Sequence, residues 1–406
     1  MSINKNTPEV CIDAFLLTRQ WRDTSKGIVL DFWFYSHAGP VHVLIENQQA
    51  IFFIRQEDVE QVKRILFSLS AMLIKSLGLK DFDHRPVSAI YFTSQHDLYQ
   101  ARALLQDAQI RHYEADIRPV ERFLAERFIT GAVQIKSASR PLKANDANAQ
   151  SSAQLILNPH IRPLENSKKY QPKLKTLSLD IETAYDSQAL YSISLLCAHW
   201  HITLMIGAID DGQTQALKNT QNIEFFDNEK ALMLRFIELI IEQDPDVIIG
   251  WNVINFDFQF LQKKADSLKI SLSIGRSESL PVWRKAQTEQ EHYFLLIPGR
   301  VVLDGIDTLK NATLNFSSFS LQSVAGELLG RGKLIGDEHT DKQKSRQKNF
   351  DPWAGAKEIK RRFNEDKLAL AAYNLEDCQL VWDIFAHTDL LAFAIERAKL
   401  TGLEMD

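Results

Sequence analysis

The segment KTLSLDIE at residues 175–182 has the alternation of a β-strand, in which successive side chains point to opposite faces. Leu177, Leu179 and Ile181 would share an apolar face that packs into a core. Asp180 and Glu182 would share the opposite face and come together at the strand's end. Taken alone, this pair is better explained by an edge strand that exposes its polar face to solvent than by a functional site.

Farther along the chain, DPDVIIGWNVINFD at residues 244–257 predicts a short buried strand, a turn at Gly250 and then a helix. Asp257 falls near the start of that helix, where the partial positive charge of the helix N-terminus stabilises an ionised carboxylate. The alternative is that Asp257 only caps the helix.

A third carboxylate lies in YNLED at residues 373–377, within a long predicted helix. Tyr373 and Asp377 are four residues apart and therefore lie on one helix face, which continues through the apolar Leu380 and Ile384. An aspartate on an apolar face is costly unless it is paired or binds a metal. A surface aspartate that reaches solvent is the alternative, and the two explanations are about equal for this segment alone.

The three segments together are more specific than any one of them, because they supply four acids from a strand end, a helix start and a helix face. Hard divalent cations such as Mg²⁺ and Mn²⁺ prefer carboxylate oxygens. Two such ions about 4 Å apart can stabilise both the attacking and the leaving oxygen in phosphodiester cleavage. The set is Asp180, Glu182, Asp257 and Asp377.

The length of 406 residues and the alternation of strand and helix patterns predict at least two α/β domains. In the first, strands are expected at 28–35, 41–45 and 88–93, a helix through 59–69, and a capping box at Ser94-x-x-Asp97. Residues 134–173 are polar and proline-rich and predict a loose connector, and 337–349 predict an exposed loop. In the second domain, strands are expected at 174–182, 190–197, 202–209, 246–251 and 300–304, and helices at 229–243, 257–268, 320–329, 356–363 and 366–386.

Composition narrows the class of protein. The formal net charge of −5 differs from the basic balance of proteins that coat nucleic acid, so we expect any nucleic-acid contact to be local, or to be helped by metal ions or by a missing partner region. The three cysteines lack C-x-x-C spacing, which predicts neither disulfides nor a thiolate metal site. We find no signal-peptide pattern and no apolar run long enough to span a membrane, and therefore expect a cytoplasmic protein without membrane contact.

The three acidic segments resemble the exonuclease motifs of family-B DNA polymerases: D-I-E at 180–182, N-x-x-x-F-D at 252–257 and Y-x-x-x-D at 373–377. Their order and wide spacing also fit. The third motif is of the subclass with tyrosine, because Ala372 stands where the other subclass has histidine. Further segments resemble the bacterial DNA polymerase II branch of the family, among them 15–23, 113–133, 244–253, 299–307 and 315–325.

This resemblance implies a small α/β N-terminal domain at 1–133, the connector at 134–173, and a ribonuclease H-like 3′→5′ exonuclease domain at 174–395 whose mixed sheet is flanked by helices. Residues 396–406 would begin a polymerase region. The sequence contains neither D-x-x-S-L-Y-P-S nor Y-G-D-T-D-S, so we expect no DNA synthesis from this chain, with the polymerase domain a missing partner.

The resemblance also implies the site. Asp180 would bind both ions of a Mg²⁺ or Mn²⁺ pair, Glu182 would bind one and orient the attacking water, and Asp257 and Asp377 would complete the site. Tyr373, as a protonated phenol, would donate a hydrogen bond to that water or to the scissile phosphate. Asn252 and Phe256 would contact the terminal nucleotides.

The implied activity is proofreading: release of deoxynucleoside 5′-monophosphates from single-stranded or frayed DNA 3′ ends by a monomer. Two alternatives stay open, an inactive fragment or nucleic-acid-binding module, and an exoribonuclease on the same scaffold. Asp304 and Asp307 are expected to be structural, and the basic runs at 168–175 and 357–362 to be solvated. Trp21, Trp33, Trp251 and Trp353 are expected in cores.

Overall fold

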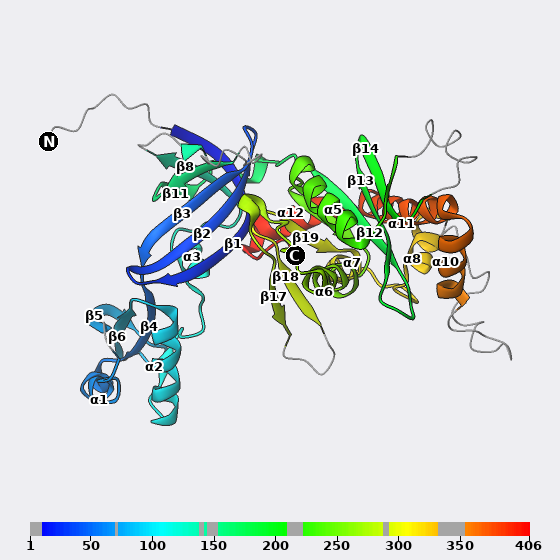
Figure 1. Ribbon diagram of the computed structural model, residues 1–406. Helices are drawn as coiled ribbons and strands as arrows, with labels where there is room; N and C mark the ends of the chain where they lie inside the picture. The colour runs from blue at the N-terminus through cyan, green and yellow to red at the C-terminus, as the bar shows by residue number, and fades with distance from the viewer. Residues whose placement is uncertain are drawn as a thin grey trace. The chain divides into compact units, whose positions relative to one another are not determined.

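The computed structural model describes residues 10–69, 72–137, 142–143, 153–208, 222–286, 292–331 and 354–406 (Figure 1). They form two compact units, which are described separately. The first contains the described parts of Met1–Ala147, Ser152–Pro172 and Lys399–Leu403, and the second contains those of Lys173–Ala398 and Glu404–Asp406. The domain limits inferred from the sequence stay a prediction.

The first unit is built on a seven-stranded sheet of order β11-β8-β1-β2-β3-β10-β9. Its strands are antiparallel neighbours, except that β10 runs parallel to β3. The strands are β1 (Val10–Thr24), β2 (Gly27–Ser36), β3 (Val41–Gln48), β8 (Ala132–Ser137), β9 (Leu142–Lys143), β10 (Gln154–Leu157) and β11 (His160–Pro163). Aromatic and β-branched residues dominate β2, and nine of its ten residues are buried, which is typical of a central strand.

A second, four-stranded antiparallel sheet of order β5-β6-β4-β7 belongs to the same unit. It contains β4 (Ala50–Arg55), β5 (Met72–Lys80), β6 (Pro86–Phe92) and β7 (His112–Tyr113). The helices of the unit are η1 (Gln56–Asp58), α1 (Val59–Ile65), α2 (Gln95–Asp107), α3 (Pro119–Ala125) and η2 (Ser167–Lys169). Phe32, Phe52 and Phe92 are fully buried in the core of this unit.

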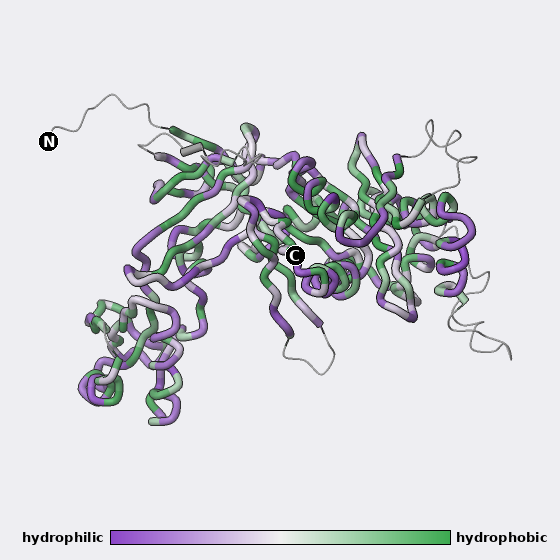
Figure 2. Tube along the Cα trace, in the orientation of Figure 1, coloured by the Kyte–Doolittle hydropathy of each residue, from purple (hydrophilic) through white to green (hydrophobic). Residues whose placement is uncertain are grey.

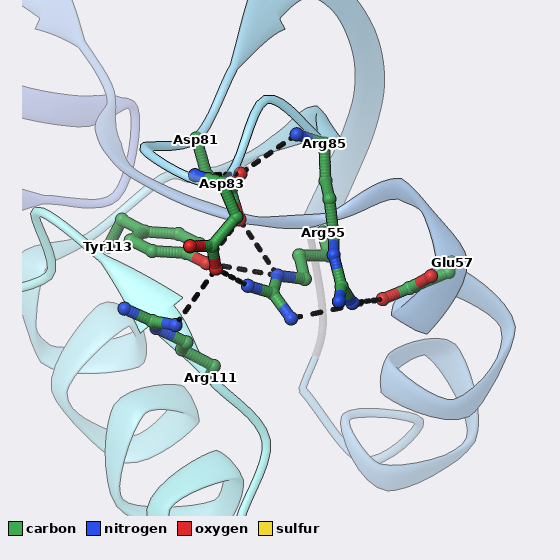
Figure 3. A network of polar contacts seen from close by, with 7 residues as sticks. All are labelled: Arg55, Glu57, Asp81, Asp83, Arg85, Arg111 and Tyr113. Carbon is green, nitrogen blue, oxygen red and sulfur yellow. Dashed lines mark hydrogen bonds and ion pairs between the residues drawn. The ribbon is translucent and has the colours of Figure 1, made fainter.

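A network of charged side chains joins the β5–β6 turn to β4 and β7 (Figure 3). The Arg55 Nε and the Tyr113 hydroxyl both donate to Asp81 Oδ2 at 2.8 Å, and the Arg85 backbone N–H donates to Asp81 Oδ1 at 2.9 Å. Arg55 also donates to Asp83 Oδ2 at 2.5 Å. The Asp81 side chain is only 1% exposed, so these bonds replace the water that it loses on folding.

Most of the predicted elements of this unit are confirmed. The strands at 28–35, 41–45 and 88–93 are β2, β3 and β6, and the Ser94 side chain accepts the Asp97 backbone N–H at 3.0 Å as the N-cap of α2. The helix expected through 59–69 ends earlier, at Ile65.

The prediction of a loose segment at 134–173 is wrong for much of its described part. β10 and β11 lie within it, together with β9 and most of β8. These strands complete the large sheet. They were not predicted because they are short and lie among prolines and polar residues. The loop expected at 337–349 lies outside the described residues.

The second unit has a mixed six-stranded sheet of order β15-β14-β13-β12-β16-β19. β13 is antiparallel to β12 and β14, whereas β16 is parallel to β12 and β19, and β15 is parallel to β14. The strands are β12 (Thr176–Thr183), β13 (Leu190–Cys197), β14 (Trp200–Ile206), β15 (Ile223–Phe226), β16 (Val247–Gly250) and β19 (Val301–Asp304), and a separate hairpin joins β17 (Val282–Lys285) to β18 (Tyr293–Leu296).

The two faces of this sheet differ in chemistry. On one face, Leu179, Ile181 and Ile193 join a hydrophobic core with Phe236 of α5 and Phe258. On the other face, helix α11 covers the polar side of β12 and β13. The helices are α5 (Glu229–Gln243), α6 (Gln259–Leu268), α7 (Gly305–Asn311), α8 (Leu321–Leu329), α10 (Ala354–Glu365), α11 (Lys367–His387) and α12 (Leu390–Thr401), with the short turns η3 (Ile254–Phe258) and η4 (Arg276–Glu278).

Every strand and helix predicted in this unit is present, and 190–197 and 229–243 match β13 and α5 to the residue. The expected solvated face at 357–362 falls on α10, none of whose residues is buried and along which Figure 2 shows many hydrophilic positions. Among the described residues no single helix is long and apolar enough to cross a membrane, although α11 and α12 together pass that test with a bend of 54° between them.

Candidate metal centre

Asp180 and Glu182 lie on β12, which has β13 on one side and β16 on the other. Asp180 is partly buried and Glu182 is 7% exposed. The interpretation of β12 as a solvent-facing edge strand is therefore wrong. Alternation along the strand turns both carboxylates toward α11, and their cross-strand neighbours are Ser194 and Ser192.

Helix α11 brings Asp377 to the same place. Asp377 is 1% exposed, and the apolar stripe through Leu380 and Ile384 is fully buried, so the surface interpretation of Asp377 is wrong. Asp180, Glu182 and Asp377 each offer a carboxylate oxygen within 4.8 Å of those of the other two. This spacing is short enough for shared cation binding.

Asp257 joins the group from a different kind of backbone. It lies in η3, a π-helical turn in which the Phe258 N–H donates to the Val253 carbonyl at 2.8 Å, rather than at the start of a regular helix. Asp257 is 2% exposed, and its Oδ1 accepts the Ile181 N–H at 3.1 Å. The helix-cap interpretation is wrong, because the N-cap residues of η3 and α6 are Val253 and Phe258, and the Asp257 carboxylate instead accepts a backbone N–H of β12.

The tight chain path before η3 explains the glycine that precedes it. A Cβ at Gly250 would lie 2.6 Å from the Val253 side chain and 2.8 Å from the Leu179 carbonyl. Only glycine allows β16 to end this close to β12. The turn that follows can therefore place Asp257 against the backbone between Asp180 and Glu182.

The electrostatics of the site favour a cation. Burial, and then the charge of Asp180, raise the pKa of Asp257 well above its ordinary value, although the N–H of Ile181 opposes the shift. Gathering carboxylates in a buried place destabilises their charged forms unless an opposite charge is added. The donors are all carboxylate oxygens, which suit hard divalent cations, so these residues fit a Mg²⁺ or Mn²⁺ site.

The remaining predicted residues lie around this group. Tyr373 is one helical turn before Asp377, 5% exposed, and packs with Ala184, Tyr191 and Leu370. Asn252 is exposed and has a positive φ of 56°.

Phe256 is 46% exposed, next to Asp257 in the chain. It lines a surface pocket of about 210 Å³ that does not include Asn252. The pocket residues are Gln188, Asn255, Phe256, Gln259, Phe260, Lys263, Lys264 and Ser267.

One residue of the site was missed by the sequence analysis. Asn374 is fully buried, and its Nδ2 donates to Asp180 Oδ2 at 2.6 Å. Its signal was a polar amide next to Tyr373 in a helix with many apolar residues, although nothing in the spacing indicated which acid it would contact.

Other predictions about polar residues can be compared with their contacts. Asp304 caps α7 by accepting the Ile306 N–H at 3.0 Å and also accepts the Ile254 N–H at 3.3 Å, which is a structural role as predicted. Within the run at 357–362, Arg361 and Arg362 bond to Glu358 on their own helix, as expected for a solvated face.

Two of the tryptophans expected in cores differ in environment. Trp33 is 1% exposed, whereas the Trp251 indole is only partly buried and donates to the Phe319 carbonyl at 3.0 Å.

Protein-family models match residues 14–324 of the chain. The model of the DNA polymerase family B exonuclease domain matches residues 110–324, more than half of the chain. The chain belongs to DNA polymerase family B. Models of the N-terminal and insertion domains of DNA polymerase II match residues 14–49 and 50–110, so the small sheet of β4 to β6 lies in the insertion domain.

Individual relatives agree with this family. DNA polymerase II of Escherichia coli (strain K12) is 37% identical over 393 residues, which cover 97% of this chain and 46% of the relative. A DNA polymerase of Thermococcus litoralis is 27% identical over 253 residues, 61% of this chain and 13% of the relative. The chain thus spans less than half the length of these relatives.

A solved structure shows the same fold. The family B DNA polymerase from the hyperthermophilic archaeon Pyrobaculum calidifontis matches with a TM-score of 0.70 at 16% identity, over 97% of this chain and 48% of that one. The predicted fold class, a mixed α/β chain with a ribonuclease H-like exonuclease domain, is confirmed.

Proposed function

We propose that this chain is a two-metal 3′→5′ exodeoxyribonuclease, the proofreading part of a DNA polymerase II-like enzyme. It would release deoxynucleoside 5′-monophosphates from single-stranded or frayed DNA 3′ ends. The convergence of Asp180, Glu182, Asp257 and Asp377 from three distant segments supports the proposal. The match to the family B exonuclease domain supports it as well.

The four carboxylates would hold two Mg²⁺ or Mn²⁺ ions, with Asp180 common to both. Once bound, the ions would supply Lewis acidity at the attacking and leaving oxygens. Glu182 orients the attacking water, and burial of the acids keeps bulk water from competing for their oxygens. Tyr373 donates a hydrogen bond to that water or to the scissile phosphate from its place one turn before Asp377.

The pocket beside Phe256 offers a surface for the bases that precede the 3′ terminus. Phe256 in η3 is exposed, Phe260 in the first turn of α6 is partly exposed, and both line the pocket. Stacking on such a ring is worth roughly 1–3 kcal/mol per base and tolerates any sequence. Lys263 is exposed and can meet a phosphate, whereas the Lys264 Nζ is bonded to Glu229 Oε1 at 2.9 Å. Asn252, which is exposed two residues after β16, would contact the terminal nucleotide.

The test uses the purified chain and a 5′-labelled single-stranded DNA oligonucleotide, with Mg²⁺ and with EDTA. We expect a ladder that shortens from the 3′ end and is absent with EDTA. Asp180→Ala should abolish the ladder, whereas Asp227→Ala, which removes an exposed acid of the same unit, should not.

Three outcomes would overturn the proposal. Cleavage by Asp180→Ala at the wild-type rate would refute the site. Folded wild-type protein that binds the oligonucleotide without shortening it in Mg²⁺ or Mn²⁺ would indicate a non-catalytic module. A matched RNA oligonucleotide cleaved faster than the DNA would identify an exoribonuclease instead.

A further inference from the structure

A polar layer separates α11 from the sheet beneath the candidate metal centre. Ser178 on β12 and Ser192 and Ser194 on β13 are fully buried. An aliphatic side chain would also be compatible with burial at these positions. Each hydroxyl has a defined partner. Ser178 Oγ donates to the Cys378 carbonyl at 2.9 Å, and Ser194 Oγ pairs with Thr203 Oγ1 at 2.8 Å.

The third hydroxyl leads to the metal site. Ser192 Oγ donates to Asn374 Oδ1 at 3.0 Å, and Asn374 Nδ2 donates to Asp180 Oδ2 at 2.6 Å. The donor and acceptor roles in these two hydrogen bonds follow from Asp180, because an ionised carboxylate only accepts. The NH₂ group of Asn374 must therefore face Asp180, and its oxygen must face the serine.

This arrangement fixes a torsion that is otherwise soft. The terminal torsion of an aspartate has a broad, nearly two-fold preference, so an unsupported carboxylate can turn. Asp180 is only partly buried, so packing holds it less tightly than it holds Asp377. Asn374 and Ser192 are both fully buried and provide a rigid anchor on two different elements, α11 and β13.

We propose that Asn374, itself oriented by Ser192, is a positioning residue that sets the orientation of the Asp180 carboxylate for divalent-cation binding. The inference rests on the proposed function of this site. Outer hydrogen bonds to a metal ligand typically change metal affinity or activity by about 10- to 100-fold when removed. We expect a reduction of that size in cation affinity, while the fold stays unchanged.

Ser194 provides the matched control. It lies in the same layer, is equally buried, and is the cross-strand partner of Asp180, but its hydroxyl bonds to Thr203. Ser194→Ala therefore removes a buried hydrogen bond at the same depth without touching the path from Ser192 through Asn374 to Asp180.

The experiment measures Mn²⁺ binding to the full chain by calorimetry and by the electron paramagnetic resonance signal of free Mn²⁺, without substrate. We expect Asn374→Leu, which keeps the side-chain volume, to weaken binding by about 10- to 100-fold. Ser192→Ala should weaken it by a smaller factor, because the amide keeps its bond to Asp180 but loses its anchor. Ser194→Ala should bind within about twofold of wild type, and the thermal midpoints of the cation-free variants show whether each one folds.

A second measurement separates positioning from general damage. At raised Mg²⁺, Asn374→Leu should recover most of its oligonucleotide cleavage, whereas Asp180→Ala should not. Wild-type Mn²⁺ affinity in both Asn374→Leu and Ser192→Ala would overturn the inference and leave the proposed function standing. Equal weakening by Ser194→Ala would overturn it as well. A wild-type chain that binds no Mn²⁺ would overturn both. If Asn374→Leu does not fold, Ser192→Ala decides the matter by the same criteria.

Discussion

Asp81 in the insertion domain and Asp257 in the second unit both have buried side chains, yet their surroundings shift their pKa values in opposite directions. Burial opposes ionisation of Asp81, but hydrogen bonds from the Arg85 backbone, Tyr113 and Arg55 outweigh it and lower the pKa (Figure 3). Burial of Asp257 is reinforced by the charge of Asp180, so its pKa rises. The charges of the first arrangement are balanced within the protein, whereas the proposed function requires a bound cation to balance those of the second.

The largest expected effect comes from neutralising an acid in the second arrangement. Asp257→Asn keeps an oxygen that can accept the Ile181 N–H, but it removes one negative charge. We expect DNA cleavage to fall on the order of 10³-fold or more, as for other residues that act as a unit at an active site. The thermal midpoint without metal should stay the same or rise, because repulsion with Asp180 is relieved.

Single-turnover cleavage and thermal unfolding in EDTA test both parts. A clear fall in the midpoint, with cleavage retained, would show that Asp257 is a structural acid like Asp81.

The corresponding change in the insertion domain is Asp81→Asn. It weakens the bonds to Arg55 and Tyr113 and leaves their polar groups less satisfied in a place with little solvent. We expect the urea midpoint of the first unit to fall while cleavage of single-stranded DNA by the second stays within about twofold. Fluorescence unfolding and the oligonucleotide ladder measure the two effects. A large loss of cleavage in folded protein would mean that the network serves the nuclease.

Asp304 sharpens the comparison because it has hydrogen bonds like Asp81 but a raised pKa like Asp257. Burial, and then the charge of Asp307, raise its pKa to about 6. The folded state therefore binds this proton more tightly than the unfolded chain, and stability is lost as pH rises from about 4 to about 6. By linkage this loss is on the order of 2–3 kcal/mol.

Asp304→Asn should remove that part of the pH dependence. Urea unfolding of both proteins between pH 4 and 7, compared as a difference curve, isolates it from the other carboxyl groups. A flat difference curve would mean that Asp304 ionises in the folded state as easily as in the unfolded chain.

The sequence predicted most of the fold because its signals were local. Strand alternation placed Asp180 and Glu182 on one face, and helical spacing placed Tyr373 on the side of Asp377. The strands β10 and β11 were missed because four residues in a polar, proline-rich region carry little periodicity, and the large sheet supplies their hydrogen bonds.

The site was less predictable in its details. The π-turn at Asp257 follows from the close approach of Gly250 to β12, a tertiary contact that no local pattern encodes. Asn374 was missed for a similar reason, because its value depends on Ser192 in a strand far away in the sequence.

The smallest expected effects concern two helix caps, one in each unit. Ser94 accepts the Asp97 N–H at 3.0 Å at the start of α2, and Asn228 accepts the Ala231 N–H at 2.9 Å at the start of α5. Replacing either residue by alanine should cost about 1 kcal/mol, because one backbone donor loses its partner.

The two cap variants show whether the units unfold separately. If they do, Ser94→Ala should lower only the midpoint reported by amide exchange in unit 1, and Asn228→Ala only that in unit 2. The lower midpoint should leave cleavage at 25 °C unchanged in both. Equal shifts in both units from either variant would mean that the two units unfold in one cooperative transition. In that case Asp81 in the first unit and Asp257 in the second unit would contribute to the same free energy of unfolding.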